Sequence, residues 1–465
     1  MRRFGIGLGI FFLFILIILV LNTSPVKRAS YFNEEYYDNT SALIDKIGPE
    51  ILIINDSVQA GFAKVSITPG IGNNEDIPSE GKFIKVPLAG YGDREGRPAT
   101  GIHDSLFVKA VALKAGNRIA IIVGADILIM PPNIIDTLTL LLAEKGISRD
   151  QLFFSATHSH SGPGAWGPGF VGEQFAGKEN RSVEKWLVSQ IGKAVISAID
   201  DLSSASIGSG SFSAAPYTRN RLSGDLGTKN DDFSFIVIEQ TRGKKAIIGS
   251  FSAHATTLGD DNMEFSADYP GFWERKVEET SADMAMFCAG SMGSQSPSGQ
   301  GTGFEKAQYI GEALADSLVK NLKHVALNER ITFSAMTLKI VLPDYHFRLT
   351  TKINLSSYLS RKLMPPPGDV YLQVLRLDNL LWITTPADFS GEYALQIKNS
   401  LATRGFNANV TSFNGNYIGY IIPGKYYYID EYESKLMGWF GPNMGDYTMD
   451  MIHRMTDIVT KPVNN

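Results

Sequence analysis

Two short apolar runs, separated by a helical segment, constrain the fold of this chain more than any other feature. Ile119–Val123 is apolar throughout, which predicts a strand inside a sheet. Asn133–Lys145 has the apolar spacing of a helix, and Gln151–Ser155 is a second apolar run. The order strand, helix, strand predicts a βαβ unit, in which functional residues lie at the carboxyl ends of the strands.

A pair of histidines follows the second of these strands. His158 and His160 stand between Gln151–Ser155 and the turn residues Ser161–Gly164, in a chain with only 7 histidines. Residues i and i+2 of an extended segment point the same way, so both imidazoles are expected to face one cleft. The pattern favours metal binding or acid–base chemistry. A polar strand end with two solvated histidines is the alternative.

Other polar residues share this position just after a buried strand, namely His254, Ser296 and Asp388. Two imidazoles and one carboxylate form a common catalytic zinc set with an open position for water, and His158, His254 and Asp388 have the right context. Bound zinc lowers the pKa of water to about 7. The spacing alone does not decide the matter, because there is no HExxH helix and these residues lie far apart in the sequence.

Four further residues have simple structural interpretations. Ser296 precedes a proline and fits a turn, and its surroundings are not a GxSxG elbow. Arg221 fits a surface charge. Tyr420 and Tyr432 fit aromatic packing, since Asn414–Gly445 is rich in Tyr, Gly and Trp and lacks a helical or alternating period.

The composition excludes several classes of function. Of 465 residues, 44% are hydrophobic, which is enough for a sizeable core. The net charge of −5, without a basic run, argues against a nucleic-acid partner. Cys288 is the only cysteine, so an internal disulfide and a cysteine-based zinc site are both impossible.

The amino-terminal segment has the pattern of an export signal. Met1-Arg-Arg3 precedes an uncharged, mostly apolar run, Phe4–Leu21, which is long enough to cross a bilayer as a helix. A clean cleavage site does not follow, so an uncleaved membrane anchor is preferred over a cleaved signal peptide. We expect an anchor over residues 1–22, a stalk with a short helix over 23–50, and an exported domain over 51–465 outside the cytoplasm.

The rest of the sequence predicts one large α/β domain with mixed β-sheets flanked by helices. Val370–Leu377 and Leu380–Thr384 are expected to form a hairpin. Ser182–Leu202 and Ala307–Leu327 have the apolar pattern of helices. Asn414–Gly445 is expected to be a long ordered loop near the carboxyl terminus.

One motif resembles a known family. Ala156-Thr-His-Ser-His-Ser-Gly-Pro-Gly164 resembles the Thr-His-Thr-His-Ser-Gly-Pro-Gly signature of the neutral ceramidases. Shorter stretches resemble other motifs of the family, in the family's order, and the resemblance covers roughly residues 61–445. These stretches are Ile67–Pro69, Gly101–His103, Asn220-Arg221, Ala253-His254, Gly293–Pro297, Pro386–Phe389, Asn416–Tyr420 and Asp430–Glu433.

The resemblance implies a zinc-dependent amidohydrolase that acts on ceramide or a related N-acyl lipid at a membrane surface. Fixed donors would stabilise the negative charge that grows on the amide oxygen. A proton relay would serve the leaving amine, and water activated by zinc is the expected nucleophile, with the active-site serine as the alternative. By position, the implied zinc ligands are His158, His254, Asp388 and Tyr420, and the implied catalytic residues are Ser296, His160, Arg221 and Tyr432.

The sequence departs from the family pattern at three points. Asp388 stands where the family has glutamate, which leaves Glu392 as an alternative ligand. Ser294 replaces an aspartate before the active-site serine. The chain also stops soon after the tyrosine-rich block, where the family has an immunoglobulin-like domain. Two other functions therefore stay open: hydrolysis of another N-acyl amide or ester, and lipid binding without catalysis.

Overall fold

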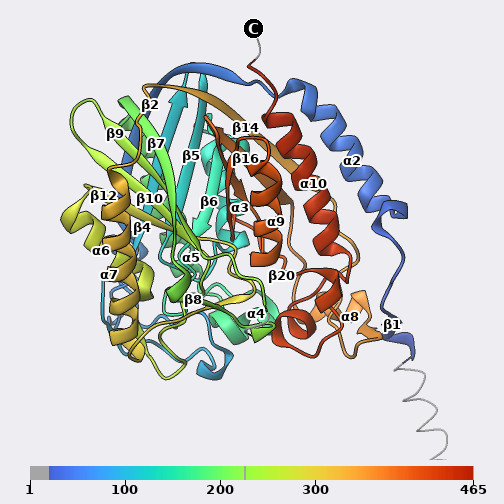
Figure 1. The fold of residues 1–465 in the computed structure, drawn as a ribbon. Coiled ribbons are helices and arrows are strands. Elements are labelled where there is room, and N and C mark those ends of the chain that lie inside the picture. Colours follow the sequence, from blue (N-terminus) through green and yellow to red (C-terminus); the bar gives the residue numbers. More distant parts are fainter. Residues whose placement is uncertain (1–19, 225–226, 464–465) are drawn as a thin grey trace, which may run out of the picture.

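A branched, mixed β-sheet forms the centre of the molecule, which the computed structural model describes over residues 20–224 and 227–463 (Figure 1). The strands of this sheet are β2 (Ile54–Ser66), β4 (Phe107–Ala115), β5 (Arg118–Ala125), β6 (Leu152–Ala156), β7 (Ser203–Ser213), β9 (Asp232–Gln240), β10 (Lys245–Phe251), β12 (Met284–Ala289), β14 (Arg330–Ile340), β16 (Val370–Leu377), β17 (Leu380–Thr384) and β19 (Asn407–Thr411). Their order along the main path is β12-β10-β9-β7-β2-β14-β16-β17-β19, and β4, β5 and β6 form a branch from β2.

The branch point is β2, the long strand that both parts of the sheet share. Its residues 54–57 pair with β14, and its residues 58–66 pair with β4. The branch lies against the main path, because β5 and β6 contact β12 and β6 also contacts β17. Buried aliphatic and aromatic side chains from both parts fill the space between them. The residues that follow β6, β10 and β17 consequently meet at one place.

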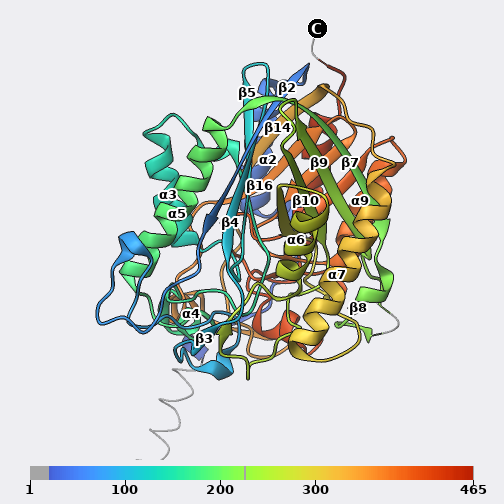
Figure 2. The same cartoon turned by 90° about the vertical axis from the view of Figure 1, so that its left-hand side faces the viewer.

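Helices cover the outer faces of the sheet in three groups (Figures 1 and 2). The groups are α3 (Pro132–Ala143) with α5 (Arg181–Asp200), α6 (Asp268–Thr280) with α7 (Gly303–Leu322), and α9 (Gly391–Ala402) with α10 (Met444–Val459). The first group packs on β2 and β4, the second on β12 and β7, and the third on β14, β16 and β19. Each group buries its apolar face in a separate core.

The first described residues of the chain pack against the domain. β1 (Thr23–Pro25) pairs antiparallel with β15 (Ile353–Leu355). α2 (Glu35–Ile47) lies against α10 and β14. The segment 23–50, expected to be a stalk with a short helix, therefore contains that helix and lies along the carboxyl-terminal part of the domain.

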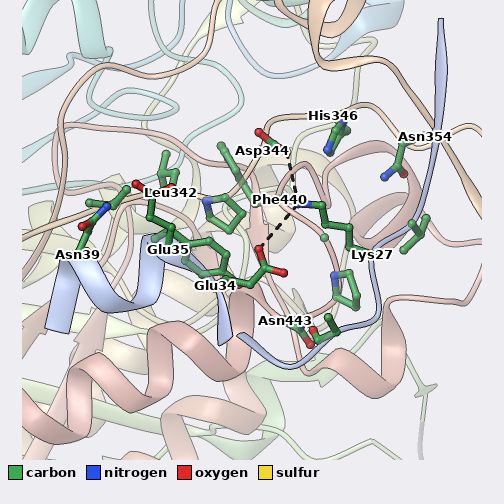
Figure 3. A pocket seen from close by; sticks show the side chains of 17 residues that line it. Lys27, Glu34, Glu35, Asn39, Leu342, Asp344, His346, Asn354, Phe440 and Asn443 are labelled. Atoms are coloured by element: carbon green, nitrogen blue, oxygen red, sulfur yellow. Dashed lines mark hydrogen bonds and ion pairs between the residues drawn. The ribbon is translucent and has the colours of Figure 1, made fainter. Parts of the chain in front are cut away.

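A polar cavity of about 420 Å³ lies where this segment meets residues 341–346 and 440–443. Figure 3 shows Lys27 reaching between Glu34 and Asp344, with N–O distances of 3.8 and 3.7 Å. Both contacts are long and solvent-exposed, so they add little to stability. The β1–β15 pairing and the apolar face of α2 hold the segment in place.

Several predictions of secondary structure are confirmed. β5, α3 and β6 follow one another, and β5 pairs in parallel with β6, as the βαβ unit requires. The hairpin of β16 and β17 has the predicted bounds. The predicted loop, Asn414–Gly445, is mostly irregular but includes β20 (Tyr420–Ile421) and a short π-helical turn, η9 (Tyr432–Leu436). The sequence patterns did not predict α6, α9 or α10.

The predicted membrane anchor, residues 4–21, lies almost entirely outside the described residues. Over 20–224 and 227–463, the structure contains no helix that is both long and apolar enough to span a bilayer. The anchor and the domain boundaries drawn from it stay predictions.

Candidate metal centre

Three buried side chains from distant parts of the chain meet at one end of the sheet. His158 follows β6, His254 follows β10 and Asp388 follows β17. Their ligand atoms all lie within 4.8 Å of one another. Asp388 Oδ1 lies 3.6 Å from His158 Nε2 and 3.3 Å from His254 Nε2. The structure thus brings together the three residues that the strand-end position had singled out.

The backbone turns sharply at the first histidine. His158 has a φ of 61°, in the left-handed region, so the chain leaves β6 through a turn. The imidazole of His158 stacks on Phe413 with 4.4 Å between the ring centroids. His160 Nε2 lies 3.3 Å from His158 Nε2. Both imidazoles therefore face one place, as predicted, but the predicted reason was wrong, because the segment between them is not extended.

Each ligand histidine has one ring nitrogen bound to the backbone. We assign the proton of both rings to Nδ1, because His158 Nδ1 lies 2.7 Å from Leu128 O and His254 Nδ1 lies 3.0 Å from Gln295 O. An imidazole that donates from Nδ1 has a lone pair on Nε2, and the Nε2 atoms of both rings lie near Asp388 Oδ1. Asp388 Oδ1 is buried and has no hydrogen-bond donor among the described residues. Buried acceptors that face one another in this way fit a metal cation between them.

Burial keeps these imidazoles neutral. It lowers the pKa of His158 to about 3, and it lowers the pKa values of His160 and His254 well below the usual value. Burial also raises the pKa of Asp388. A metal ion binds neutral imidazole and ionised carboxylate, so an ion here would stabilise the charged form of Asp388.

Two tyrosines, Tyr417 and Tyr420, lie next to the carboxylate of Asp388. β18 (Asp388–Phe389) pairs in parallel with β20, and this register sets Asp388 opposite Tyr420. The Tyr420 hydroxyl lies 3.0 Å from His254 Nε2. Tyr417 donates a hydrogen bond to Asp388 Oδ2 at 2.7 Å and so orients the carboxylate. Sequence reasoning gave no role to Tyr417, although it lies in a motif that resembles the family.

Arg221 lies on the His254 side of this group. Its Nη2 lies 3.2 Å from His254 Nε2 and donates to the Tyr420 hydroxyl at 2.8 Å. Its Nε lies 2.7 Å from Glu433 Oε1. Burial alone would lower the pKa of Arg221, but Tyr420 and Glu433 raise it above its ordinary value. Arg221 is therefore a fixed positive charge beside the group, held by a glutamate that sequence reasoning did not single out.

The other predicted site residues lie around the edge of the group. The side chain of Tyr432 is 52% exposed, and its ring centroid lies 5.9 Å from that of Tyr420. The ring of His160 lies 6.2 Å from that of His254, and its Nδ1 is buried without a hydrogen-bond partner among the described residues. Ser296 is half-buried in the strand β13 (Gln295–Pro297), directly after the residue whose carbonyl binds His254. The catalytic roles of these residues stay predictions.

The structure distinguishes between Asp388 and Glu392, the two carboxylates that the sequence offered as metal ligands. Glu392 binds Lys425 Nζ at 2.6 Å and the Tyr426 hydroxyl at 3.1 Å. Asp388, and not Glu392, is the carboxylate that faces the imidazoles. Ser294, which stands in the place of an aspartate, accepts a hydrogen bond from Gly391 N at 3.2 Å and so supports the start of α9.

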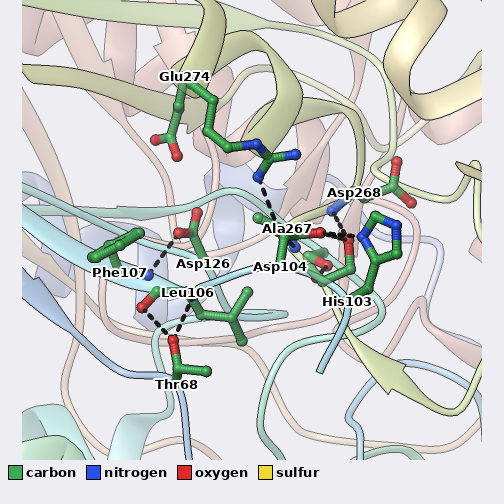
Figure 4. Close-up of polar contacts among 12 residues, drawn as sticks. Thr68, His103, Asp104, Leu106, Phe107, Asp126, Ala267, Asp268 and Glu274 are labelled. Atoms are coloured by element: carbon green, nitrogen blue, oxygen red, sulfur yellow. Dashed lines mark hydrogen bonds and ion pairs between the residues drawn. The ribbon is translucent and has the colours of Figure 1, made fainter. Parts of the chain in front are cut away.

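A polar network fixes the turn that carries the histidines. Ser159 donates to Ser266 O at 2.5 Å, and Ser266 donates from its hydroxyl to Asp104 Oδ2 at 2.6 Å. Asp104 also accepts a hydrogen bond from Arg275 at 3.1 Å. Figure 4 shows Asp104 at the centre of these contacts, with the ring of His103 beside it. Asp104, the residue after the Gly101–His103 motif, therefore helps to fix the turn between His158 and His160.

Two imidazoles and one carboxylate, gathered at strand ends of an α/β fold, are an arrangement typical of metal-dependent enzymes. The sequence profile of the family described as neutral/alkaline non-lysosomal ceramidase, N-terminal, matches residues 70–312. The chain belongs to this family of ceramidase-type hydrolases, which confirms the resemblance seen in the histidine motif.

Solved structures show the same fold. The chain superimposes on the crystal structure of neutral ceramidase from Pseudomonas aeruginosa with a TM-score of 0.73 and 18% identity, over 88% of this chain and 76% of that one. A structure entitled "Ceramidase complexed with C2" gives the same TM-score, identity and coverage. A search of curated protein sequences found no match.

Proposed function

We propose that this chain is a zinc-dependent amidohydrolase that cleaves the amide bond of ceramide or a related N-acyl lipid and releases a fatty acid and a free amine. One observation carries the proposal. The Nε2 lone pairs of His158 and His254 and the unpartnered oxygen of Asp388 converge in a chain of the ceramidase family.

The kind and spacing of the ligand atoms support zinc. Zinc binds histidine nitrogen and carboxylate oxygen at about 2.0–2.2 Å, and two ligands in a tetrahedral arrangement at that distance lie roughly 3.4 Å apart. The distances from Asp388 Oδ1 to the two imidazoles, 3.6 and 3.3 Å, agree with this value. His158, His254 and Asp388 would hold the ion, with the Tyr420 hydroxyl as a fourth ligand.

The side chains around the group fit the demands of amide hydrolysis. A bound divalent ion would polarise the amide carbonyl and lower the pKa of water. Arg221 keeps its charge, so it can stabilise the negative charge that develops on the amide oxygen. His160 is neutral and its Nδ1 has no hydrogen-bond partner among the described residues, which suits a proton relay to the leaving amine, and Tyr432 can bind the substrate at the edge. Ser296 is the alternative nucleophile to water.

Apolar side chains at the edge of the group support a lipid substrate. Tyr432 and Leu436, both in η9, are 52% and 54% exposed. An acyl chain that packed on them would remove this apolar surface from water. An anchored position outside the cytoplasm, expected from residues 1–22, would keep the group close to such lipids.

Metal analysis combined with a panel of N-acyl substrates tests the proposal. We expect about one zinc ion per chain, cleavage of long-chain ceramide, loss of activity with a chelator and recovery with added zinc. Cleavage of soluble short-chain amides alone would contradict the lipid assignment. Far less than one zinc ion per chain, without chelator-sensitive hydrolysis, would favour a lipid-binding relative that lacks catalysis.

A further inference from the structure

One stretch of surface outside the metal group combines unpaired cations with exposed apolar side chains. Residues 345–368 contain no acidic residue in a chain whose net charge is −5, and three of their cationic residues, Lys352, Arg361 and Lys362, are exposed. The fourth, Arg348, is buried. Over residues 20–224 and 227–463, the side chains of Lys352, Arg361 and Lys362 form no ion pair with a carboxylate. An acidic protein therefore has a basic patch at this place.

Large apolar side chains are exposed around these cations. Tyr358 and Leu363 belong to α8 (Ser357–Leu363), and the side chain of Tyr358 is 68% exposed. Further exposed apolar side chains at this place are those of Leu349, Ile353 and Phe170. An exposed cluster of aromatic and aliphatic side chains usually marks a surface that binds a partner.

The members of this cluster are neighbours in the fold. α4 (Gly169–Ala176), which carries Phe170, packs against α8, and a Cβ added at Gly169 would lie 3.1 Å from Leu363 O. Leu349 N donates to Ile353 O at 3.0 Å. Figure 1 shows α4, α8 and β1 at the same end of the molecule.

The chain enters the described structure at the same place. Ser356 N donates to Asn22 O at 2.8 Å, so Val20 and Leu21 lie beside the start of α8, and both are exposed. In the sequence, these two residues end the apolar run Phe4–Leu21. The exposed cluster is therefore continuous with the most apolar segment of the chain.

We propose that this docking surface, formed by residues 20–21, Phe170 and the exposed side chains of residues 349–363, binds a lipid bilayer that contains anionic lipids. Aromatic and aliphatic side chains next to lysine and arginine are the composition of surfaces that lie in the membrane interface. The cations complement anionic headgroups, and the apolar side chains enter the boundary between headgroups and acyl chains.

The docking surface adjoins the edge of the metal group. Arg348 Nη2 donates to Ile429 O at 2.6 Å, and Ile429 lies shortly before η9, which carries Tyr432. A docked molecule would therefore hold η9 near the bilayer. This link to substrate access rests on the proposed function, whereas docking itself does not.

Fluorescent labels on the full chain test the proposal. Cys288 is buried, and its burial raises the pKa of the thiol to about 12, so it does not compete with an introduced cysteine for the label. An environment-sensitive dye is placed at Tyr358→Cys or at Leu363→Cys, and the protein is bound to phosphatidylcholine vesicles with or without phosphatidylglycerol. We expect a blue shift of the emission and quenching by nitroxide lipids at both positions when phosphatidylglycerol is present.

Leu140→Cys is the matched control, because Leu140 is 72% exposed but lies on α3. The label there should show neither change, even though an inserted amino-terminal segment would keep the protein on the vesicle. The double variant R361Q/K362Q should reduce the ratio of docked to undocked label about 30-fold on phosphatidylglycerol vesicles. The double variant K320Q/K323Q, on and next to α7, should leave it unchanged.

Equal responses at positions 140 and 358 would overturn the proposal, as would equal responses with and without phosphatidylglycerol. Thermal unfolding of each variant verifies that it is folded. Because the readout is fluorescence and not hydrolysis, a negative result would leave the proposed enzymatic activity untouched.

Discussion

Tyr417 donates its hydroxyl hydrogen to Asp388 Oδ2 at 2.7 Å, and this leaves Oδ1 of the same carboxylate facing the two imidazoles. Both side chains are largely or fully buried, so water does not compete for this hydrogen bond. The phenol thus decides which carboxylate oxygen can bind a metal ion.

We expect Tyr417→Phe to weaken metal binding about 10- to 100-fold, because hydrogen bonds that orient a ligand carboxylate contribute on this scale. Competition with a chromogenic chelator measures the affinity. Tyr426→Phe is the matched control, since the hydroxyl of Tyr426 binds Glu392 and not Asp388. Equal affinities for these two variants would contradict the role given to Tyr417.

The two histidines of the sequence motif should respond differently to substitution. His158→Ala should remove most of the bound metal, because the Nε2 atom of His158 faces Asp388. His160→Ala should retain the metal but lower kcat roughly 10²- to 10⁴-fold, as the loss of a proton relay does. Metal content and steady-state kinetics on the same preparations separate the two effects. If His160→Ala also lost the metal, His160 would be a ligand and the proposed relay would be wrong.

Glu433 should act through Arg221. Glu433→Gln removes the charge that holds Arg221 Nε at 2.7 Å, so we expect kcat to fall roughly 10- to 100-fold through misplacement of the guanidinium, with little change in KM. Glu433→Asp should recover part of the loss. Glu144→Gln, at an exposed position at the end of α3, is the control and should have no effect. A change in KM alone would instead indicate that Glu433 contributes to substrate binding.

The metal-free protein should lose stability as the pH falls. The folded state holds the pKa of His158 at about 3, whereas the unfolded chain has a value of about 6.5. Between these values the unfolded state binds a proton that the folded state does not, so the free energy of unfolding falls by about 1.4 kcal/mol per pH unit for each such histidine. His160 and His254 act in the same direction. The raised pKa of Asp388 offsets part of the loss, since the folded state takes up a proton there.

Thermal unfolding of chelator-treated protein between pH 7.5 and 5.5 measures this effect. The wild-type Tm should fall more steeply with pH than that of the double variant H158A/H254A. Parallel curves for the two proteins would show that other groups cause the acid sensitivity.

The sequence predicted the metal group because each of its members is a polar residue after an apolar strand, and such positions collect at one end of a sheet. It could not show that His158 and Asp388 touch, because β6 and β17 are not neighbours in the sheet order. Their contact arises when the branch β4–β6 packs on the main path, a tertiary arrangement that no local pattern encodes.

The supporting residues were harder to predict. Tyr417 and Tyr420 lie in one aperiodic stretch, and only the register of β18 against β20 decides which phenol faces which carboxylate oxygen. The contact of Glu433 with Arg221 likewise depends on the path of the backbone in η9. The helix α6 escaped prediction because Pro270 and Gly271 usually mark a turn, although a proline in the first turn of a helix costs little.

The long strand β2 has a consequence for biosynthesis. One end of β2 finds its partner only when β14 has been made, which is late in the chain. Until then, residues 54–57 present an open strand edge that can pair with other polypeptides. Pairing between strands so far apart in the sequence forms slowly, and it leaves the nascent chain exposed to aggregation until the ribosome has completed β14.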